Sequence, residues 1–161
     1  MSGDRASPVC YAGQADDAYM GYAGREEIVA ALTELLEAER AGARVALRSA
    51  REAVDARLVA LMKSVQRDEA RWCAMLSRQL KRVGATPSRR CGAFYGKAMA
   101  IADPVERLLF LNKGQTWVVR KLEALLPRVR DDILHQSLRD MLVSHVDNIR
   151  QADDVAASLP R

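Results

Sequence analysis

Four polar residues interrupt the apolar helical stripes of this chain at a regular spacing. Glu39 and Glu69 are 30 residues apart, and Gln115 and His145 are also 30 residues apart. The second pair follows the first by 76 residues. A duplicated helical hairpin with polar side chains pointing inward at one level has this pattern, and four-helix bundles build metal sites in this way. The spacing therefore predicts an all-α four-helix bundle made of two hairpins.

The apolar pattern places four long helices around these residues. Apolar side chains recur at helical spacing, and few stretches alternate with the period of a strand. Asp55 and the pair Asp103-Pro104 are suitable helix starts. Gly84 is typical of the residue that follows a helix. The predicted helices cover about residues 25–53, 56–83, 104–126 and 131–155.

A long connection, about residues 85–103, separates the second and third helices. Such a connection joins parallel helices at opposite ends of a bundle, and residues 93–99 within it are expected to form a short helix of their own. The preceding residues 1–24 are rich in Gly, Ala, Ser, Asp and Tyr and have no clear period, so they are predicted to be a mobile N-terminal arm. Residues 25–161 are predicted to form the bundle, a single domain.

Composition argues against several classes of partner. The net charge is +4, and the 25 basic residues are spread over all predicted helices without a basic run that includes aromatic residues, so no nucleic-acid partner is expected. No apolar run reaches the ~20 residues that span a bilayer, so no membrane partner is expected. The three cysteines form no CxxC pair and no secretory leader is visible, which favours a cytoplasmic protein.

Two segments around the acidic pair resemble a known family. Residues 35–42 and 67–72 are similar to the ferritin-like superfamily, which includes the rubrerythrins. Residues 112–122 and 145–149 are similar to an uncharacterised bacterial branch of that superfamily, of unknown function. The resemblance covers roughly residues 25–155 and implies a ferritin-like bundle. It also implies that six metal-ligand positions of the family correspond to Glu39, Glu69, Trp72, Gln115, His145 and Asn148.

Departures from the family pattern argue against an ordinary di-iron centre. Trp72 replaces a histidine, and an indole N–H only donates hydrogen bonds. Gln115 replaces a glutamate, and His145 and Asn148 stand where the family has Glu-x-x-His. Two carboxylates and one imidazole remain, a ligand set that suits one open-coordination Fe(II) ion. The sequence thus predicts a site for one Fe (or Mn or Zn) ion with a redox or oxygen-handling role, at Glu39, Glu69, Gln115 and His145.

A metal-free bundle is the alternative. Hydrogen bonds from His145, Gln115 and other inward polar side chains would then neutralise Glu39 and Glu69. A buried polar network of this kind would be a relic of a lost metal site, and the protein would act as a structural or interaction module. Burial of charge is costly unless it is paired, so one glutamate would be protonated. The sequence names no substrate or reaction in either case.

The apolar residues outside the inward stripes, notably Val29 and Val119, favour a homodimer over a ferritin cage. Nothing in the sequence specifies the symmetry of a cage, and storage of iron requires a working oxidation site.

Overall fold

The computed structural model describes residues 17–160, and this part of the chain is helical. It contains four long helices, one short helix and one 3₁₀ turn. The elements are α1 (Arg25–Glu52), α2 (Ala56–Arg82), α3 (Phe94–Met99), α4 (Pro104–Leu125), η2 (Leu126–Arg128) and α5 (Asp132–Ser158).

Side-chain caps begin three of the four long helices, as the sequence predicts. The Asp55 carboxylate accepts from the backbone N–H groups of Arg57 and Leu58 at the start of α2. Asp103 accepts from Glu106 N at 2.8 Å at the start of α4. Asp131 accepts from Leu134 N at 2.7 Å at the start of α5. Each carboxylate satisfies an N–H that has no partner within the helix, so the caps fix where the helices begin.

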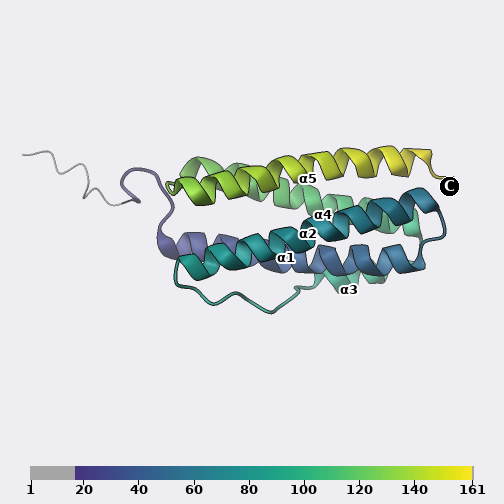
Figure 1. The fold of residues 1–161 in the computed structure, drawn as a ribbon, viewed down its shortest axis with the longest axis horizontal. Coiled ribbons are helices and arrows are strands. Elements are labelled where there is room, and N and C mark those ends of the chain that lie inside the picture. The colour runs from purple at the N-terminus through teal and green to yellow at the C-terminus, as the bar shows by residue number, and fades with distance from the viewer. Residues whose placement is uncertain (1–16, 161) are drawn as a thin grey trace, which may run out of the picture.

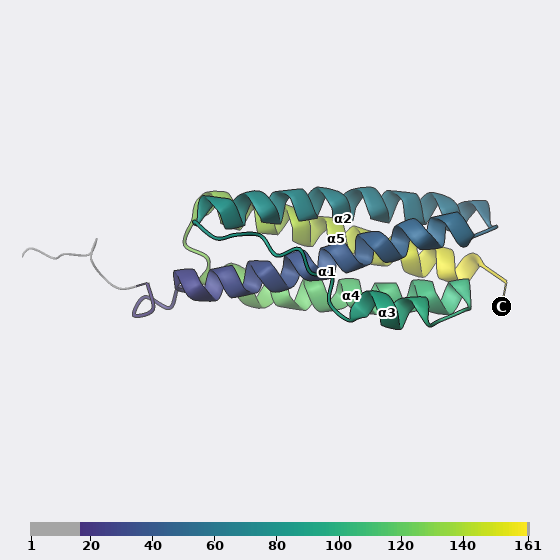
Figure 2. The ribbon, with the colours of Figure 1, turned by 90° about the horizontal axis from the view of Figure 1, so that it is seen from below.

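Two hairpins and a crossover make up the bundle. Helix α1 packs along α2, and α4 packs along α5. The crossover leaves α2 at Gly84, whose φ of 77° is the left-handed conformation of a helix end. It then runs along the outside of the bundle to the opposite end, so α2 and α4 are parallel (Figures 1 and 2). Helix α3 lies on this crossover and contacts α1 and α4. The predicted four-helix bundle with a long crossover is confirmed.

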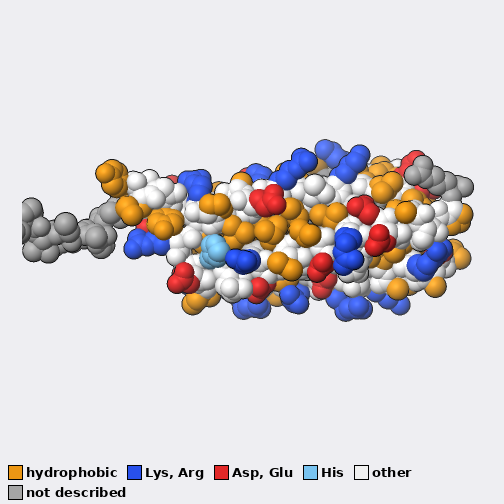
Figure 3. Space-filling model, turned by 90° about the horizontal axis from the view of Figure 1, so that it is seen from above, with side chains coloured by type: hydrophobic (Ala, Val, Ile, Leu, Met, Phe, Trp, Pro, Cys, Tyr) orange, Lys and Arg blue, Asp and Glu red, His pale blue; other side chains and the backbone are white. Residues whose placement is uncertain are grey.

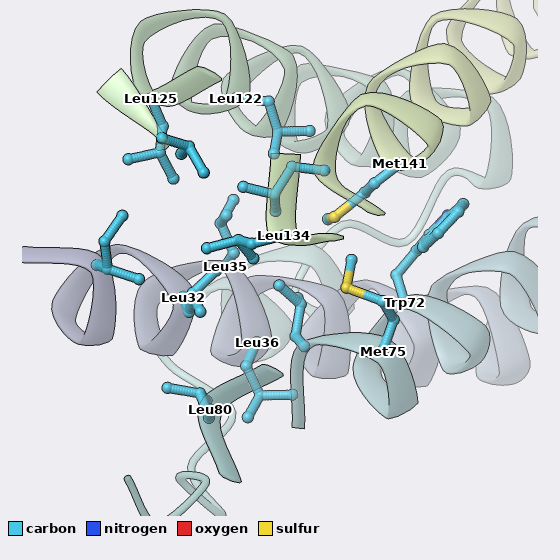
Figure 4. Close-up of a cluster of buried hydrophobic side chains, with 14 of the residues drawn as sticks. Leu32, Leu35, Leu36, Trp72, Met75, Leu80, Leu122, Leu125, Leu134 and Met141 are labelled. Carbon is cyan, nitrogen blue, oxygen red and sulfur yellow. The ribbon is translucent and has the colours of Figure 1, made fainter. Parts of the chain in front are cut away.

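The core consists of two apolar clusters that follow one another along the bundle axis. The first contains residues from 28–36, 72–80 and 118–141, and Figure 4 shows its packed Leu, Met and Trp side chains. The second contains residues from 45–65 and 98–111, with Ala152 and Leu159. On every long helix, the polar residue of the 30-residue pattern lies between the segments that supply the two clusters. The polar level therefore separates two apolar halves of the core.

The surface carries both signs of charge. On the face shown in Figure 3, basic and acidic side chains are interspersed among apolar ones. No helix within residues 17–160 is long and apolar enough to cross a membrane.

Most of the predicted arm over residues 1–24 lies outside the described residues. Within its last residues, Ala23 N donates to Arg128 O at 2.8 Å. Asp17 accepts from Arg130 at 2.7 Å. The described end of the predicted arm therefore rests on the turn between α4 and α5.

Candidate functional site

The four residues of the spacing pattern come together in the bundle core. Glu39 on α1, Glu69 on α2, Gln115 on α4 and His145 on α5 are at most 3 % exposed. All four line one pocket of about 460 Å³. In the structure these four side chains point inward at one level of the bundle, as the sequence predicts.

His145 and Glu39 form a pair. The Nδ1 atom of His145 lies 2.9 Å from the carbonyl oxygen of Met141, which can only accept, so Nδ1 carries a proton. Its Nε2 atom lies 3.0 Å from Glu39 Oε1, and one further proton must therefore lie between these two groups. Burial opposes a charged imidazole, but the attraction and hydrogen bond of Glu39 outweigh it and raise the pKa of His145.

Glu69 occupies a space that exists because residue 42 is glycine. A Cβ atom at Gly42 would lie 2.1 Å from Glu69 Oε2 and within 2.7 Å of the other carboxylate atoms. The carboxylate is thus held directly against the α1 backbone. Burial and, secondarily, the charge of Glu39 raise the pKa of Glu69 well above its ordinary value.

Three oxygen atoms that belong to these residues are buried without a hydrogen-bond partner among the described residues. They are Glu39 Oε2, Glu69 Oε2 and Gln115 Oε1. A buried acceptor with no donor is costly and requires a proton, a water, a cation or a ligand. These three oxygens form the floor of the pocket. The floor can therefore bind a hydrogen-bond donor or a positive charge.

The crossover forms one wall of the pocket. Residues 91–94 line it, and the Phe94 ring lies against Gly114, where an added Cβ would be 2.7 Å from Phe94 Cζ. Phe94 also stacks on Phe110, with the ring centroids 4.9 Å apart. Trp117, three positions after Gly114 on α4, is 40 % exposed and lines the same pocket. Sequence reasoning missed this pocket, although a glycine next to Gln115 inside α4 is a signal for close approach by another group.

Trp72 and Asn148 do not join the acidic pair. Trp72 donates from Nε1 to Ser144 Oγ at 3.3 Å, and the Arg71 guanidinium lies over its ring. Asn148 Nδ2 is buried with no partner in the part of the chain that the structure describes. Among the six inward positions, all of them described by the structure, the hydrogen bond of the metal-free alternative is thus formed only between His145 and Glu39.

The donor set fits one metal ion and does not fit two. Two ions need about twice the ligands that Glu39, Glu69 and His145 provide, and Trp72 cannot ligate. For one ion, the unpartnered oxygens and the imidazole are suitable donors. Within residues 17–160, however, no group of three or more His, Cys, Asp or Glu side chains is already placed to hold a metal. A single ion would therefore require these side chains to move closer together.

Comparison with known proteins places the chain in a family. A family model described as a domain of unknown function, DUF6306, matches residues 26–154. The chain belongs to the DUF6306 family. No curated protein matches this DUF6306 chain.

The fold of the DUF6306 chain is ferritin-like. It is similar to the crystal structure of a ferritin-like, diiron-carboxylate protein from Bacillus anthracis str. Ames, with a TM-score of 0.73 and 17% sequence identity. The match covers 82% of this chain and 96% of the other. The predicted ferritin-like bundle is confirmed.

Proposed function

We propose that this DUF6306 protein binds one divalent metal ion, Fe, Mn or Zn, in the bundle core, and that the ion has a redox or oxygen-handling role. Glu39, Glu69 and His145 would hold the ion, and Gln115 would add its amide oxygen or orient a bound water. The observation that carries the proposal is the set of three buried oxygens that have no partner among residues 17–160 and line one pocket together with an imidazole. The similarity to a protein described as diiron-carboxylate supports it further.

The orientation of His145 supports a role as a ligand. Imidazoles that bind metals through one nitrogen usually donate the other N–H to a carboxylate or a backbone carbonyl, which fixes the ring and its tautomer. Met141 O accepts from Nδ1 in this way and leaves Nε2 directed at Glu39. A cation between Nε2 and the carboxylates would replace the proton that the pair shares.

The chain's own residues would control what reaches the ion. A bound metal supplies Lewis-acid chemistry and, in the case of iron or manganese, redox chemistry. The pocket leads to the candidate ligands between α1, α4 and the crossover. Its Ala, Leu, Val and Phe side chains favour small, weakly polar molecules over bulk water.

Elemental analysis of protein purified without chelator tests the proposal. We expect about one Fe, Mn or Zn per chain, and we expect Glu39→Ala to lose it. Glu34→Ala is the matched control, because Glu34 lines the same pocket but is exposed and paired with Lys121. Absence of metal from the parent, together with a melting temperature that Fe(II) leaves unchanged, would refute the proposal.

That refuting result would support the second candidate function, a metal-free structural or interaction bundle. The specific observation in its favour is that Glu39 Oε1 and His145 Nε2 already pair with one another. In that case Glu39→Ala should destabilise the fold without any change in metal content, because it leaves His145 buried without its partner.

A further inference from the structure

The floor of the pocket presents oxygen atoms to a ligand. Its three buried atoms without a partner among residues 17–160 that line the pocket, Glu39 Oε2, Glu69 Oε2 and Gln115 Oε1, are all oxygens, and they all accept hydrogen bonds once Glu69 gives up its proton. Each belongs to a side chain that is at least 97 % buried. A primary ammonium group donates three hydrogen bonds and accepts none, so it complements such a floor. A carboxylate ligand would offer only further acceptors.

The walls above this floor are apolar. Ala38 and Ala41 of α1, Leu111 and Val118 of α4, and Phe94 of the crossover line the pocket. A volume of about 460 Å³ is within the range of pockets that hold small organic ligands. A bare ion would make no contact with these apolar side chains, whereas an alkyl chain would cover them.

The charged residues at the pocket also favour a cation. Glu34 and Glu37 line it in addition to the two floor glutamates, against Lys113 and the His145 imidazole. Ser88 donates to Glu37, and Lys121 pairs with Glu34, so these two carboxylates are held in place.

We propose that the pocket binds a primary alkylammonium ion, with the ammonium group on the floor oxygens of Glu39, Glu69 and Gln115 and the alkyl chain along the apolar walls. This inference uses the same pocket as the proposed function but does not require a metal. A metal ion and an ammonium group would compete for the same oxygens.

Calorimetric titration of the metal-free full chain at pH 7 tests the inference with three probes of equal chain length. They are n-hexylamine, which is protonated at this pH, 1-hexanol and hexanoate. We expect hexylamine to bind at least tenfold more tightly than hexanol, and hexanoate not to bind. From butylamine to hexylamine, each methylene should tighten binding about fourfold, as burial of a CH₂ group does.

Two matched variants locate the ammonium group. Glu69→Gln removes a carboxyl group that would ionise on contact with the ammonium group, and it should weaken hexylamine at least tenfold while hexanol is unaffected. Glu34→Gln removes one charge from the exposed part of the lining and should change hexylamine binding less than threefold. A thermal melt followed by circular dichroism verifies that each variant folds. If Glu69→Gln does not fold, Gln115→Met removes another floor oxygen and replaces it in the comparison.

Three results would overturn the inference. They are equal binding of hexylamine and hexanol, equal losses in Glu69→Gln and Glu34→Gln, and no binding of hexylamine. The experiments distinguish a failure of this inference from a failure of the proposed function. A chain that binds hexylamine but contains no metal supports the inference and refutes the metal proposal. A chain that binds metal but not hexylamine does the reverse.

Discussion

The Glu69 carboxylate lies against the α1 backbone at Gly42. A single added methyl group at residue 42 should therefore change the stability of the protein. Alanine gains about 1 kcal/mol of helix propensity over glycine, but overpacking a buried contact costs about 1–3 kcal/mol. Because the added Cβ would lie within 2.7 Å of three carboxylate atoms, the cost should exceed the gain. We expect Gly42→Ala to lower the free energy of unfolding by about 1 kcal/mol in urea titrations.

Gly96→Ala is the control for that prediction. Gly96 lies in α3, and no atom of the described residues that could obstruct a Cβ lies within 4 Å of the position that it would occupy. Here only the helix propensity acts, so stability should stay the same or rise by up to about 1 kcal/mol. A Gly42→Ala protein that is as stable as Gly96→Ala would show that Glu69 does not rest on residue 42.

The buried acid and imidazole give the metal-free protein a defined pH dependence. Glu69 and His145 both have raised pKa values, so above their ordinary values of 4.5 and 6.5 the folded state retains protons that the unfolded state has lost. Stability must therefore fall as pH rises, by up to about 1.4 kcal/mol per pH unit for each retained proton. We expect the free energy of unfolding, measured with chelator present, to decrease from pH 5 to pH 9. Glu69→Gln should flatten this decrease, and an unchanged slope would contradict the assignment to Glu69.

The inward residues could be predicted from the sequence because they depend on helical geometry alone. A 30-residue spacing across a short helical connection returns the chain to the same level, which holds for Glu39 and Glu69 and again for Gln115 and His145. The partners of these residues could not be predicted. His145 pairs with Glu39, and Glu69 lies against Gly42. Both contacts depend on side-chain rotamers and on packing between helices distant in sequence. The pocket wall depends likewise on where the crossover docks Phe94.

The N-caps set the register of the helices that carry the site, and Asp131 is the clearest case. Its carboxylate caps α5 and also pairs with Arg82 of α2. We expect Asp131→Ala to cost about 1 kcal/mol at pH 7, as loss of an N-cap typically does. The neighbouring Asp132→Ala, which removes only a first-turn charge, should cost less than half as much in the same urea titrations.

The pH dependence of that cap has the opposite sign to that of the buried pair. Hydrogen bonds from Arg82 and then from Leu134 N lower the pKa of Asp131 to about 2. Its contribution is therefore fully present above the ordinary value of 3.8 and is lost as pH falls toward 2. The difference in stability between parent and Asp131→Ala should shrink over this range. A difference that stays constant would assign the loss to packing and not to the carboxylate.

At the scale of the whole molecule, we expect the bundle to form a homodimer. Of the residues on which the sequence argument relied, Val29 packs against the core and Val119 is half-buried. Other apolar side chains remain exposed on α4 and α5: Leu109, Trp117, Val143 and Val146. Pairing through these helices would cover them. Light scattering at micromolar concentration should give twice the mass of one chain. The double variant Val143→Asp with Val146→Asp should give the mass of a single chain. A monomeric parent would contradict this expectation.

The division of the core into two apolar clusters has an evolutionary consequence. Each cluster is built from leucines, methionines and alanines of several helices, so most of the folding free energy lies outside the polar layer between them. Substitutions in that layer can therefore accumulate without loss of the architecture. A lineage can exchange a metal-binding histidine for a tryptophan, or a glutamate for a glutamine, and still inherit the same bundle. Chemistry and scaffold can then diverge at different rates, and proteins of this shape can share a fold while differing in what their centres bind.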